Sequence, residues 1–257
     1  MTEQTFDVGD SPRFVASISS GSVEVVESPA GVISLRIESS REAEFEVSHS
    51  GDTVTVRRPP NGGGWSRREA HTRLRVAVPI GSTVRISCSS ADVTTEVRLN
   101  EAYIDTASGD VAIWEVKNAK VKTASGEVAI GTATGDVSLR TASGDVKVGD
   151  ATGRVEISTA SGSVDLGTTR GDVTSSTASG DLDIERYEGS DLDLKSASGS
   201  IRIGLPAGTK VALDANSMSG RIRLPERTPS GISRADRHQV RARLRTISGD
   251  IELVRLG

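Results

Sequence analysis

The sequence predicts an all-β fold, a single-domain β-solenoid (β-helix-like) with two short strands in each coil. Three observations lead to this prediction. A unit of about nine residues recurs and pairs into an 18-residue period, each unit carries a glycine, and apolar residues alternate with polar ones between the glycines. Identical sequence at a fixed spacing favours stacking of like upon like, with coils about 4.8 Å apart. An array of hairpins is the alternative arrangement of the same strands.

The clearest copies of the repeat read Thr-Ala-Ser-Gly, then an acidic residue, then an apolar one. They occupy residues 106–111, 123–128 and 141–146, with variants from 159, 177 and 196 and relaxed copies at 217–220 and 246–249. A weaker copy lies half a period away. We expect the glycines of both copies to form the corners between strands, with positive φ angles at those of the main copy. These turn glycines are Gly109, Gly126, Gly135, Gly144, Gly153, Gly162, Gly171, Gly180, Gly199, Gly220 and Gly249.

After each corner the apolar residues stand two apart, as in Val111/Ile113 and Val146/Val148, which predicts a short strand with one buried face. Stacked coils would align these residues into Val, Ile and Leu ladders that fill a narrow interior. An interior without room for rings accounts for the aromatic content of 3%. We expect the alanine two positions before each main corner glycine to point inward. These alanines are residues 107, 124, 142, 160, 178 and 197.

The two ends depart from the regular repeat, as capping regions should. Residues 1–85 are predicted to form an N-terminal β capping region of the same domain, with strands at 14–18, 22–26, 32–37, 44–47, 53–57 and 73–78. Residues 20–25 resemble one more copy of the unit. Residues 86–224 form the regular solenoid. Residues 225–257 comprise an irregular loop and C-terminal capping strands, which we expect to cover the last coil and protect its edge.

Composition excludes several classes of protein. The single cysteine, Cys88, excludes a disulfide framework and a multi-cysteine metal site. No stretch approaches 18 apolar residues, and the first ten residues lack a basic region followed by an apolar run. We therefore expect a cytoplasmic protein with neither a signal peptide nor a transmembrane segment.

An acidic ladder is the most suggestive candidate site. Asp110, Glu127, Asp145 and Asp181 occupy equivalent places on successive copies, where calcium could bridge them. An aspartate after a turn glycine more often accepts a backbone N–H, and each unit has one glycine where calcium-binding nonapeptides have several. We therefore expect no metal and no cofactor. The stacked Thr-x-Ser pairs before each corner suggest an ice-binding array, but hydroxyls at corners usually satisfy turn backbone groups.

Catalysis has little support in the sequence, and we expect a protein that is not an enzyme. The three histidines, His49, His71 and His238, lack metal-ligand spacing, and Cys88 is expected to be a small buried apolar residue. The loops within 105–204 are nearly constant in length, so they leave no wall for a catalytic cleft.

Charge is spread unevenly, with 11 basic against 5 acidic residues in 201–257. The candidate partner contacts are Arg241 and Arg243 in this basic end, and Trp65, Arg67 and Arg68 beside a glycine-rich loop. A basic patch suits a protein partner or peripheral contact with an anionic membrane. No nucleic-acid motif accompanies it, so nucleic acid is not expected as a partner. Arginines at alternate strand positions are also typical of a plain solvated face.

The repeats resemble those of the bacterial putative-adhesin, β-strand-repeat family, also called the toastrack domain. The resemblance extends to residues 74–82 (LRVAVPIGS), to 205–208 with 219–222, and to the closing 246–251, and so covers nearly the whole chain. It implies a β-repeat fold and an association with cell-envelope stress sensing, with no catalytic residues to carry over.

The sequence thus predicts a non-enzymatic β-repeat scaffold that binds a protein partner, in the context of envelope stress or regulation. The alternative is an exported adhesin or ligand-binding module. Exposed solenoid ends also permit end-to-end self-association.

Overall fold

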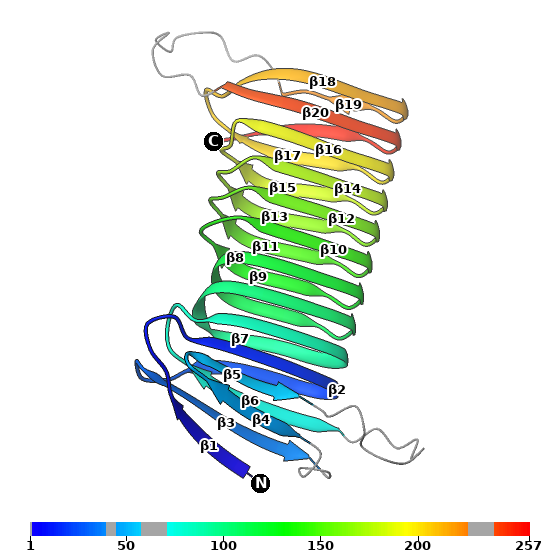
Figure 1. Cartoon of the computed structure of the whole chain (residues 1–257). Coiled ribbons are helices and arrows are strands. Elements are labelled where there is room, and N and C mark those ends of the chain that lie inside the picture. The colour runs from blue at the N-terminus through cyan, green and yellow to red at the C-terminus, as the bar shows by residue number, and fades with distance from the viewer. Residues whose placement is uncertain (1, 40–44, 58–70, 226–238) are drawn as a thin grey trace. The chain divides into compact units, whose positions relative to one another are not determined.

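The computed structural model describes residues 2–39, 45–57, 71–225 and 239–257, and all regular secondary structure in these ranges is β-strand. None of the described residues forms a helix able to cross a membrane. The chain divides into two compact units, Met1–Gly131 and Thr132–Gly257. Within each unit parallel strands stack in register as coils, so the all-β, solenoid-like architecture is confirmed (Figure 1).

Unit 1 is built around two long strands that each turn a corner without a break. The strands of this unit are β1 (Thr2–Asp7), β2 (Arg13–Glu27), β3 (Val32–Ser39), β4 (Glu46–Ser50), β5 (Thr53–Arg57), β6 (Thr72–Val78), β7 (Thr83–Ser108), β8 (Val111–Ser125) and the first part of β9 (Val128–Ala133). The predicted strands at 14–18 and 22–26 are the two halves of β2. Together they form one coil that pairs in parallel with β7, for example Val23 with Val93.

The other edge of β2 carries the irregular strands. Its first half pairs with β5 and its second half with β6, both in parallel. Strand β4 adds to β5, β3 adds to β6 and β1 adds to β3, all antiparallel. The predicted N-terminal strands are therefore present, with the start of the one predicted at 44–47 outside the described residues.

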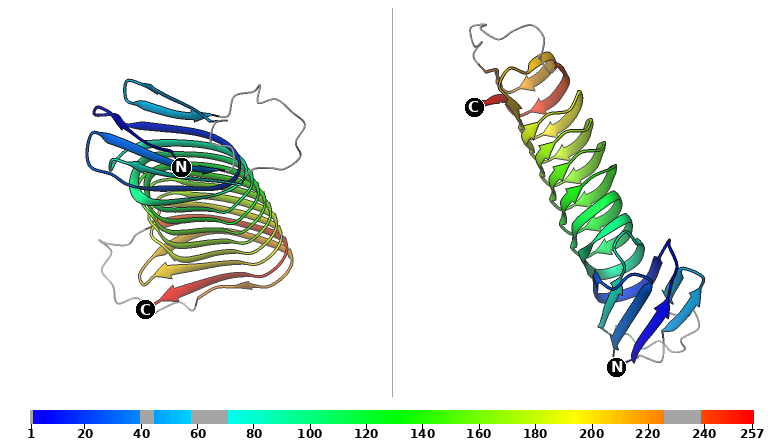
Figure 2. Two further views of the ribbon diagram at one scale, coloured as in Figure 1. Left: turned by 90° about the horizontal axis from the view of Figure 1, so that it is seen from below. Right: turned by 90° about the vertical axis from the view of Figure 1, so that its left-hand side faces the viewer.

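Unit 2 is a regular stack of coils. Its strands, after the end of β9, are β10 (Val137–Ser143), β11 (Val146–Ala151), β12 (Val155–Ser161), β13 (Val164–Thr169), β14 (Val173–Ser179), β15 (Leu182–Tyr187), β16 (Asp191–Ser198), β17 (Ile201–Pro206), β18 (Lys210–Ser219), β19 (Ile222–Arg223), β20 (Gln239–Ser248) and β21 (Ile251–Leu256). Even-numbered strands up to β16 form one wall and odd-numbered strands up to β17 the other (Figure 2).

The register of unit 2 matches the sequence period. Val137 pairs with Val155 and Val146 with Val164, 18 residues apart in each case. The step becomes 19 between β14 and β16, where Val173 pairs with Leu192. Two strands per 18-residue coil were predicted, and the pairing confirms this.

The sequence predicts that the last two strands cover the end of the stack, and this prediction is wrong. Strand β20 lies between β16 and β18, and β21 lies between β17 and β19 (Figure 1). The coil formed by β18 and β19 is therefore the end coil of unit 2. Both 217–220 and 246–249 are relaxed copies of the same corner, so the corner repeat alone does not indicate which of the two coils lies at the end.

The corners are lined inside by threonine, and the expectation of inward alanines is wrong. Thr123, Thr141 and Thr159 are buried, and each hydroxyl donates to the carbonyl two residues on at 2.9–3.1 Å. The alanine that follows each threonine points outward by strand alternation. The threonine hydroxyl thus donates a hydrogen bond to a corner carbonyl that an alanine could not supply, and for Ser125 and Ser161 this bond adds to one from a backbone N–H.

Most main-corner glycines have positive φ, and close backbone approach constrains both sets of corners. Positive φ occurs at Gly109, Gly126, Gly144, Gly162, Gly180, Gly199 and Gly249, as predicted. It is absent at Gly220, where the prediction is wrong, and at Gly135, Gly153 and Gly171 of the weaker copy. Close approach of the neighbouring backbone is the constraint that Gly153 and Gly171 share with the main corners. A Cβ on Gly171 would lie 1.8 Å from the Gly153 carbonyl oxygen.

The interior is a set of Val, Ile and Leu ladders, but it does admit rings. Phe14 in unit 1 and Tyr187 in unit 2 are fully buried. Tyr187 stands where Thr169 stands on the preceding coil, and its hydroxyl donates to the Asp191 carbonyl at 2.6 Å. Burial raises the pKa of this phenol. The low aromatic content therefore reflects the narrow ladders, and the interior accommodates a ring at single positions such as Tyr187.

Candidate interaction surfaces

The acidic ladder holds the coils together. Each main-corner aspartate accepts the backbone N–H of the equivalent position on the next coil. Asp110 accepts from Glu127 at 2.8 Å, Asp145 from Ser163 at 2.8 Å, and Asp181 from Ser200 at 2.7 Å. These bonds are exposed, and they supply an acceptor for an N–H group at the corner. The expected N–H acceptance is confirmed, with the partner on the neighbouring coil. No group of three potential metal ligands occurs among the described residues.

The other residues considered for chemistry have structural surroundings. Cys88 is buried with its Sγ 3.6 Å from the Ala91 carbonyl oxygen, and burial raises the pKa of the thiol. His49 contacts the Gly51 carbonyl through Nε2 at 2.7 Å and packs against Phe6. His71 is exposed, and His238 lies outside the described residues. The threonines of the Thr-x-Ser array face inward, so they form no hydroxyl surface for ice.

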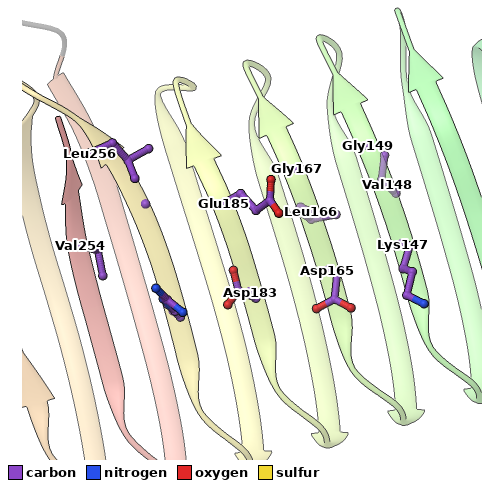
Figure 3. Close-up of a pocket in the computed structure, with 12 residues that line it drawn as sticks. Lys147, Val148, Gly149, Asp165, Leu166, Gly167, Asp183, Glu185, Val254 and Leu256 are labelled. Carbon is purple, nitrogen blue, oxygen red and sulfur yellow. The ribbon is translucent and has the colours of Figure 1, made fainter.

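A groove of about 670 Å³ lies on a wall of unit 2. Four charged side chains cross it on successive strands: Lys147 on β11, Asp165 on β13, Asp183 on β15 and Arg202 on β17. The strand register places each beside the next. Figure 3 shows Lys147, Asp165 and Asp183 projecting from neighbouring strands. The groove therefore carries the charge order plus, minus, minus, plus across the coils, with Glu185 as a further acid.

A row of glycines hollows this groove. Gly149, Gly167 and Gly204 line the groove and carry no side chain that could narrow it. A Cβ on Gly167 would lie 2.4 Å from the Gly149 carbonyl oxygen, and one on Gly204 would lie 1.9 Å from that of Glu185. The strands approach each other too closely here for any side chain but hydrogen. Val254 and Leu256 of β21 add apolar surface to the lining.

The hollow perturbs the two central acids. Burial raises the pKa of Asp165 and of Asp183, and the positive charges of Lys147 and Arg202 partly oppose that rise. The neighbouring acids, each of the two included, raise the pKa further. Asp165 is exposed and Asp183 is half-buried, and the two carboxylates lie side by side on neighbouring strands, where their negative charges repel. A cationic group bound between them would supply the missing charge.

The comparison with protein families decides what kind of chain this is. A family model described as Toastrack DUF4097 matches residues 15–254. The chain belongs to this toastrack family. The resemblance seen in the sequence is thereby confirmed, and with it the description of the chain as a β-repeat protein.

Solved structures similar to this toastrack chain share little sequence with it. A putative adhesin from Bacteroides fragilis is 12% identical, with a TM-score of 0.42 over 98% of this chain and 96% of that one. A putative adhesin from Parabacteroides merdae is 10% identical, with a TM-score of 0.42 over 100% and 96%. A putative lipid binding protein from Parabacteroides distasonis is 9% identical, with a TM-score of 0.35 over 99% and 97%. No curated protein matches the chain.

The basic end of the toastrack chain is less basic at its surface than its sequence suggests. Each of the arginines 241, 243 and 245 on β20 lies near at least one acidic residue of a neighbouring strand. Arg241 pairs with Asp191 at 3.1 Å, and Arg245 with Asp214 at 3.7 Å. Arg243 lies in register between Asp193 and Asp214. The other proposed contacts, Trp65, Arg67 and Arg68, lie outside the described residues.

Sequence reasoning missed the charged groove, although a signal for it exists. Lys147, Asp165, Asp183 and Arg202 each follow the first apolar residue of their own half-repeat. Aligning the half-repeats would have placed them in one row. The depth of the groove could not be predicted from the sequence, because it depends on how closely the strand backbones approach each other beside Gly149, Gly167 and Gly204.

Proposed function

We propose that this toastrack chain is a non-enzymatic interaction scaffold that binds a protein partner along the groove of unit 2. The observation that carries the proposal is the row Lys147, Asp165, Asp183 and Arg202, which crosses four strands inside a hollow. Charges arranged in a fixed order select a partner with the opposite order.

The complementary partner is a segment with a basic centre and acidic flanks. Its basic residues would meet Asp165 and Asp183, and its acidic residues would meet Lys147 and Arg202. At about 4.8 Å per coil, this row of four charges is about 14 Å long, which a short peptide segment covers. Apolar contacts with Val254 and Leu256 would add affinity at one end.

The non-enzymatic part of the proposal is supported by what the reactive groups do. Corner carboxylates accept backbone N–H groups, corner hydroxyls donate to backbone carbonyls, and Cys88 is buried with a raised pKa. These groups are committed to holding coils together. The envelope-stress or regulatory context and the cytoplasmic location are part of the same proposal, and demonstrated export would favour the adhesin alternative.

Cross-linking with matched variants tests the groove. The double variant Asp165→Asn/Asp183→Asn removes the central charge and keeps side-chain volume, while Asp150→Asn removes an exposed acid from β11 that does not line the groove. Tagged chains are cross-linked in host cells, and partners are identified by mass spectrometry. We expect one reproducible partner to be lost from the double variant, kept by Asp150→Asn, and lost from the wild-type chain when cross-linking follows exposure of the lysate to high salt. A partner captured equally by both variants would refute the groove as its site.

A second experiment distinguishes membrane contact at the basic end from protein binding in the groove. Anionic vesicles are pelleted with the wild-type chain and with an Arg241→Glu/Arg243→Glu variant. Vesicle binding that this variant loses would favour a peripheral membrane role for the basic end over the protein-binding groove.

End-to-end association remains a proposal with its own test. Within unit 2, the end coil exposes Met218, Ile222 and Leu224 at 79%, 42% and 57%. Sedimentation velocity should show concentration-dependent dimers that Ile222→Asp/Leu224→Asp abolishes. A monomer at every concentration would refute self-association.

A further inference from the structure

A second, shallower groove of about 420 Å³ lies on a wall of unit 1. Trp114 on β8 dominates it, and 59% of this large side chain is exposed. Solvent exposure of tryptophan on a regular strand is unusual, because burying the ring is strongly favourable. The other outward residues that line the groove are Thr94, Glu96, Ala112, Ala129 and Gly131.

The surroundings of Trp114 leave its ring open. Val111, Ile113 and Val116 on the same strand are buried, so alternation directs Trp114 outward. Gly131 lies directly beside it, where a Cβ would be 2.5 Å from the Trp114 carbonyl oxygen. Backbone contact therefore excludes any side chain beside the ring on that coil. Small residues elsewhere in the lining, Ala112 and Ala129, produce an apolar shelf around an exposed ring.

Two polar groups lie on the opposite side of this shelf. A register irregularity in β7 between Thr95 and Arg98 places Glu96 across from Trp114, and alternation exposes both Glu96 and Thr94. Of the lining residues, all of them described, none is lysine or arginine. The groove thus offers an aromatic face, one carboxylate acceptor and one hydroxyl, with no cation for a phosphate or a sulfate.

We infer that this groove, hereafter the Trp114 shelf, is a binding site for a neutral saccharide. A pyranose ring has a flat face of C–H groups, which matches an exposed indole, and hydroxyls at its rim, which match Glu96 and Thr94. Single-stranded nucleic acid also stacks on aromatic rings, but its backbone requires a positively charged groove. A membrane surface would require basic residues around the ring, and the nearest charge in the lining is acidic.

The Trp114 shelf is separate from the function proposed above, since it lies in the other unit and takes a different ligand. Loss of the charged groove through Asp165 and Asp183 would leave saccharide binding intact. Loss of Trp114 would leave partner capture intact. Failure of either proposal can therefore be recognised without reference to the other.

Tryptophan fluorescence gives a direct test, because the chain has 2 tryptophans. In a Trp65→Phe background Trp114 is the only one, and its emission reports what contacts the shelf. The probes are linear oligosaccharides of glucose, N-acetylglucosamine and mannose, titrated to about 10 mM, with sorbitol as an acyclic control. We expect a saturable change in Trp114 emission with at least one oligosaccharide and none with sorbitol.

Variants then assign the binding energy by calorimetry with the same oligosaccharide. Trp114→Ala is expected to raise Kd at least about tenfold, Trp114→Phe less, and Glu96→Gln about threefold or more, because stacking and the charged acceptor each contribute. Ile247→Ala, which trims a side chain that is 55% exposed in unit 2, is the matched control and should not alter Kd. Circular dichroism checks that each variant is folded.

Three results would overturn the inference. One is the absence of any saturable emission change with all three oligosaccharides. Another is binding that survives Trp114→Ala unchanged. The third is a response to a proline-rich peptide with none to the saccharides, which would make the shelf a peptide site.

Discussion

Replacing Gly162 by alanine should lower the free energy of unfolding of the coil stack severely, for two reasons that the structure makes visible. Gly162 forms a main corner of unit 2 with φ +135°, a region that side chains rarely enter. The added Cβ would also lie 2.2 Å from the Gly144 carbonyl oxygen and 2.7 Å from its carbon. Neither group can move freely, because both belong to the backbone of the preceding coil.

The two costs can be estimated separately. Holding a non-glycine residue in this backbone region costs about 1–3 kcal/mol. Overpacking against a backbone that is fixed by strand pairing costs about another 1–3 kcal/mol. Gly162→Ala should therefore lower the free energy of unfolding by about 2–6 kcal/mol, a large part of the 5–15 kcal/mol typical of a domain.

Two matched variants separate these costs. Gly167→Ala adds a contact of 2.4 Å with the Gly149 carbonyl oxygen but has no positive φ. Gly81→Ala has φ +82° with no atom within 4 Å of the new Cβ. Urea unfolding followed by circular dichroism should place Gly162→Ala below both in stability. If Gly162→Ala unfolds at the same urea concentration as Gly81→Ala, close stacking of the coils is not what requires glycine.

Three further outcomes follow from the bonds within unit 2. Asp145→Ala should lower the free energy of unfolding by about 1 kcal/mol, because the Ser163 N–H at the corner loses its acceptor. Asp150→Ala is the control, at an exposed position away from these corner bonds, and it should change the free energy of unfolding little in the same urea titration. Thr159→Val should lower the free energy of unfolding by about 1 kcal/mol through loss of the partly buried hydrogen bond to the Ser161 carbonyl. Thr177→Val should be neutral or stabilising, because the buried Thr177 hydroxyl has no hydrogen-bond partner. Equal effects of the two variants on the free energy of unfolding would contradict this reasoning. Burial raises the pKa of Asp183, so the folded state carries a penalty above that raised pKa and none below the ordinary value of 3.8. Asp183→Asn should therefore raise the melting temperature at pH 7 by the equivalent of less than about 1 kcal/mol, and no gain at pH 7, or an equal gain at pH 3, would contradict the sign.

The fold was predictable because the repeat and the structure share one period. Valines 18 residues apart, such as Val146 and Val164, are the residues that pair. One departure from the 18-residue period is also visible in the sequence, where Gly109 and Gly126 are 17 residues apart. This shorter step reflects the extra residue in β7 between Thr95 and Arg98. Hydrophobic alternation and glycine spacing carry such information because both respond to local backbone geometry.

Other features depend on contacts that no local pattern encodes. The level at which β20 enters the stack is one, since the corner copies at 217–220 and 246–249 are equivalent in sequence. The direction of the corner side chains is another. Alanine was expected inside on size alone, but the threonine hydroxyl is buried there and donates a further hydrogen bond to a corner carbonyl.

The same separation explains where function should be sought in this fold. Inward positions must repeat, because each coil rests on an identical neighbour, and the corner residues must repeat because they bond from coil to coil. Outward wall positions neither stack in the interior nor form the corner bonds, so their residues can differ from coil to coil. A specific surface therefore arises where the outward residues depart from the repeat. Trp114 in unit 1 and the row from Lys147 to Arg202 in unit 2 are such breaks. Both lie beside glycines at which a Cβ would collide with the backbone of the neighbouring strand, so no side chain occupies the wall next to the residues that vary.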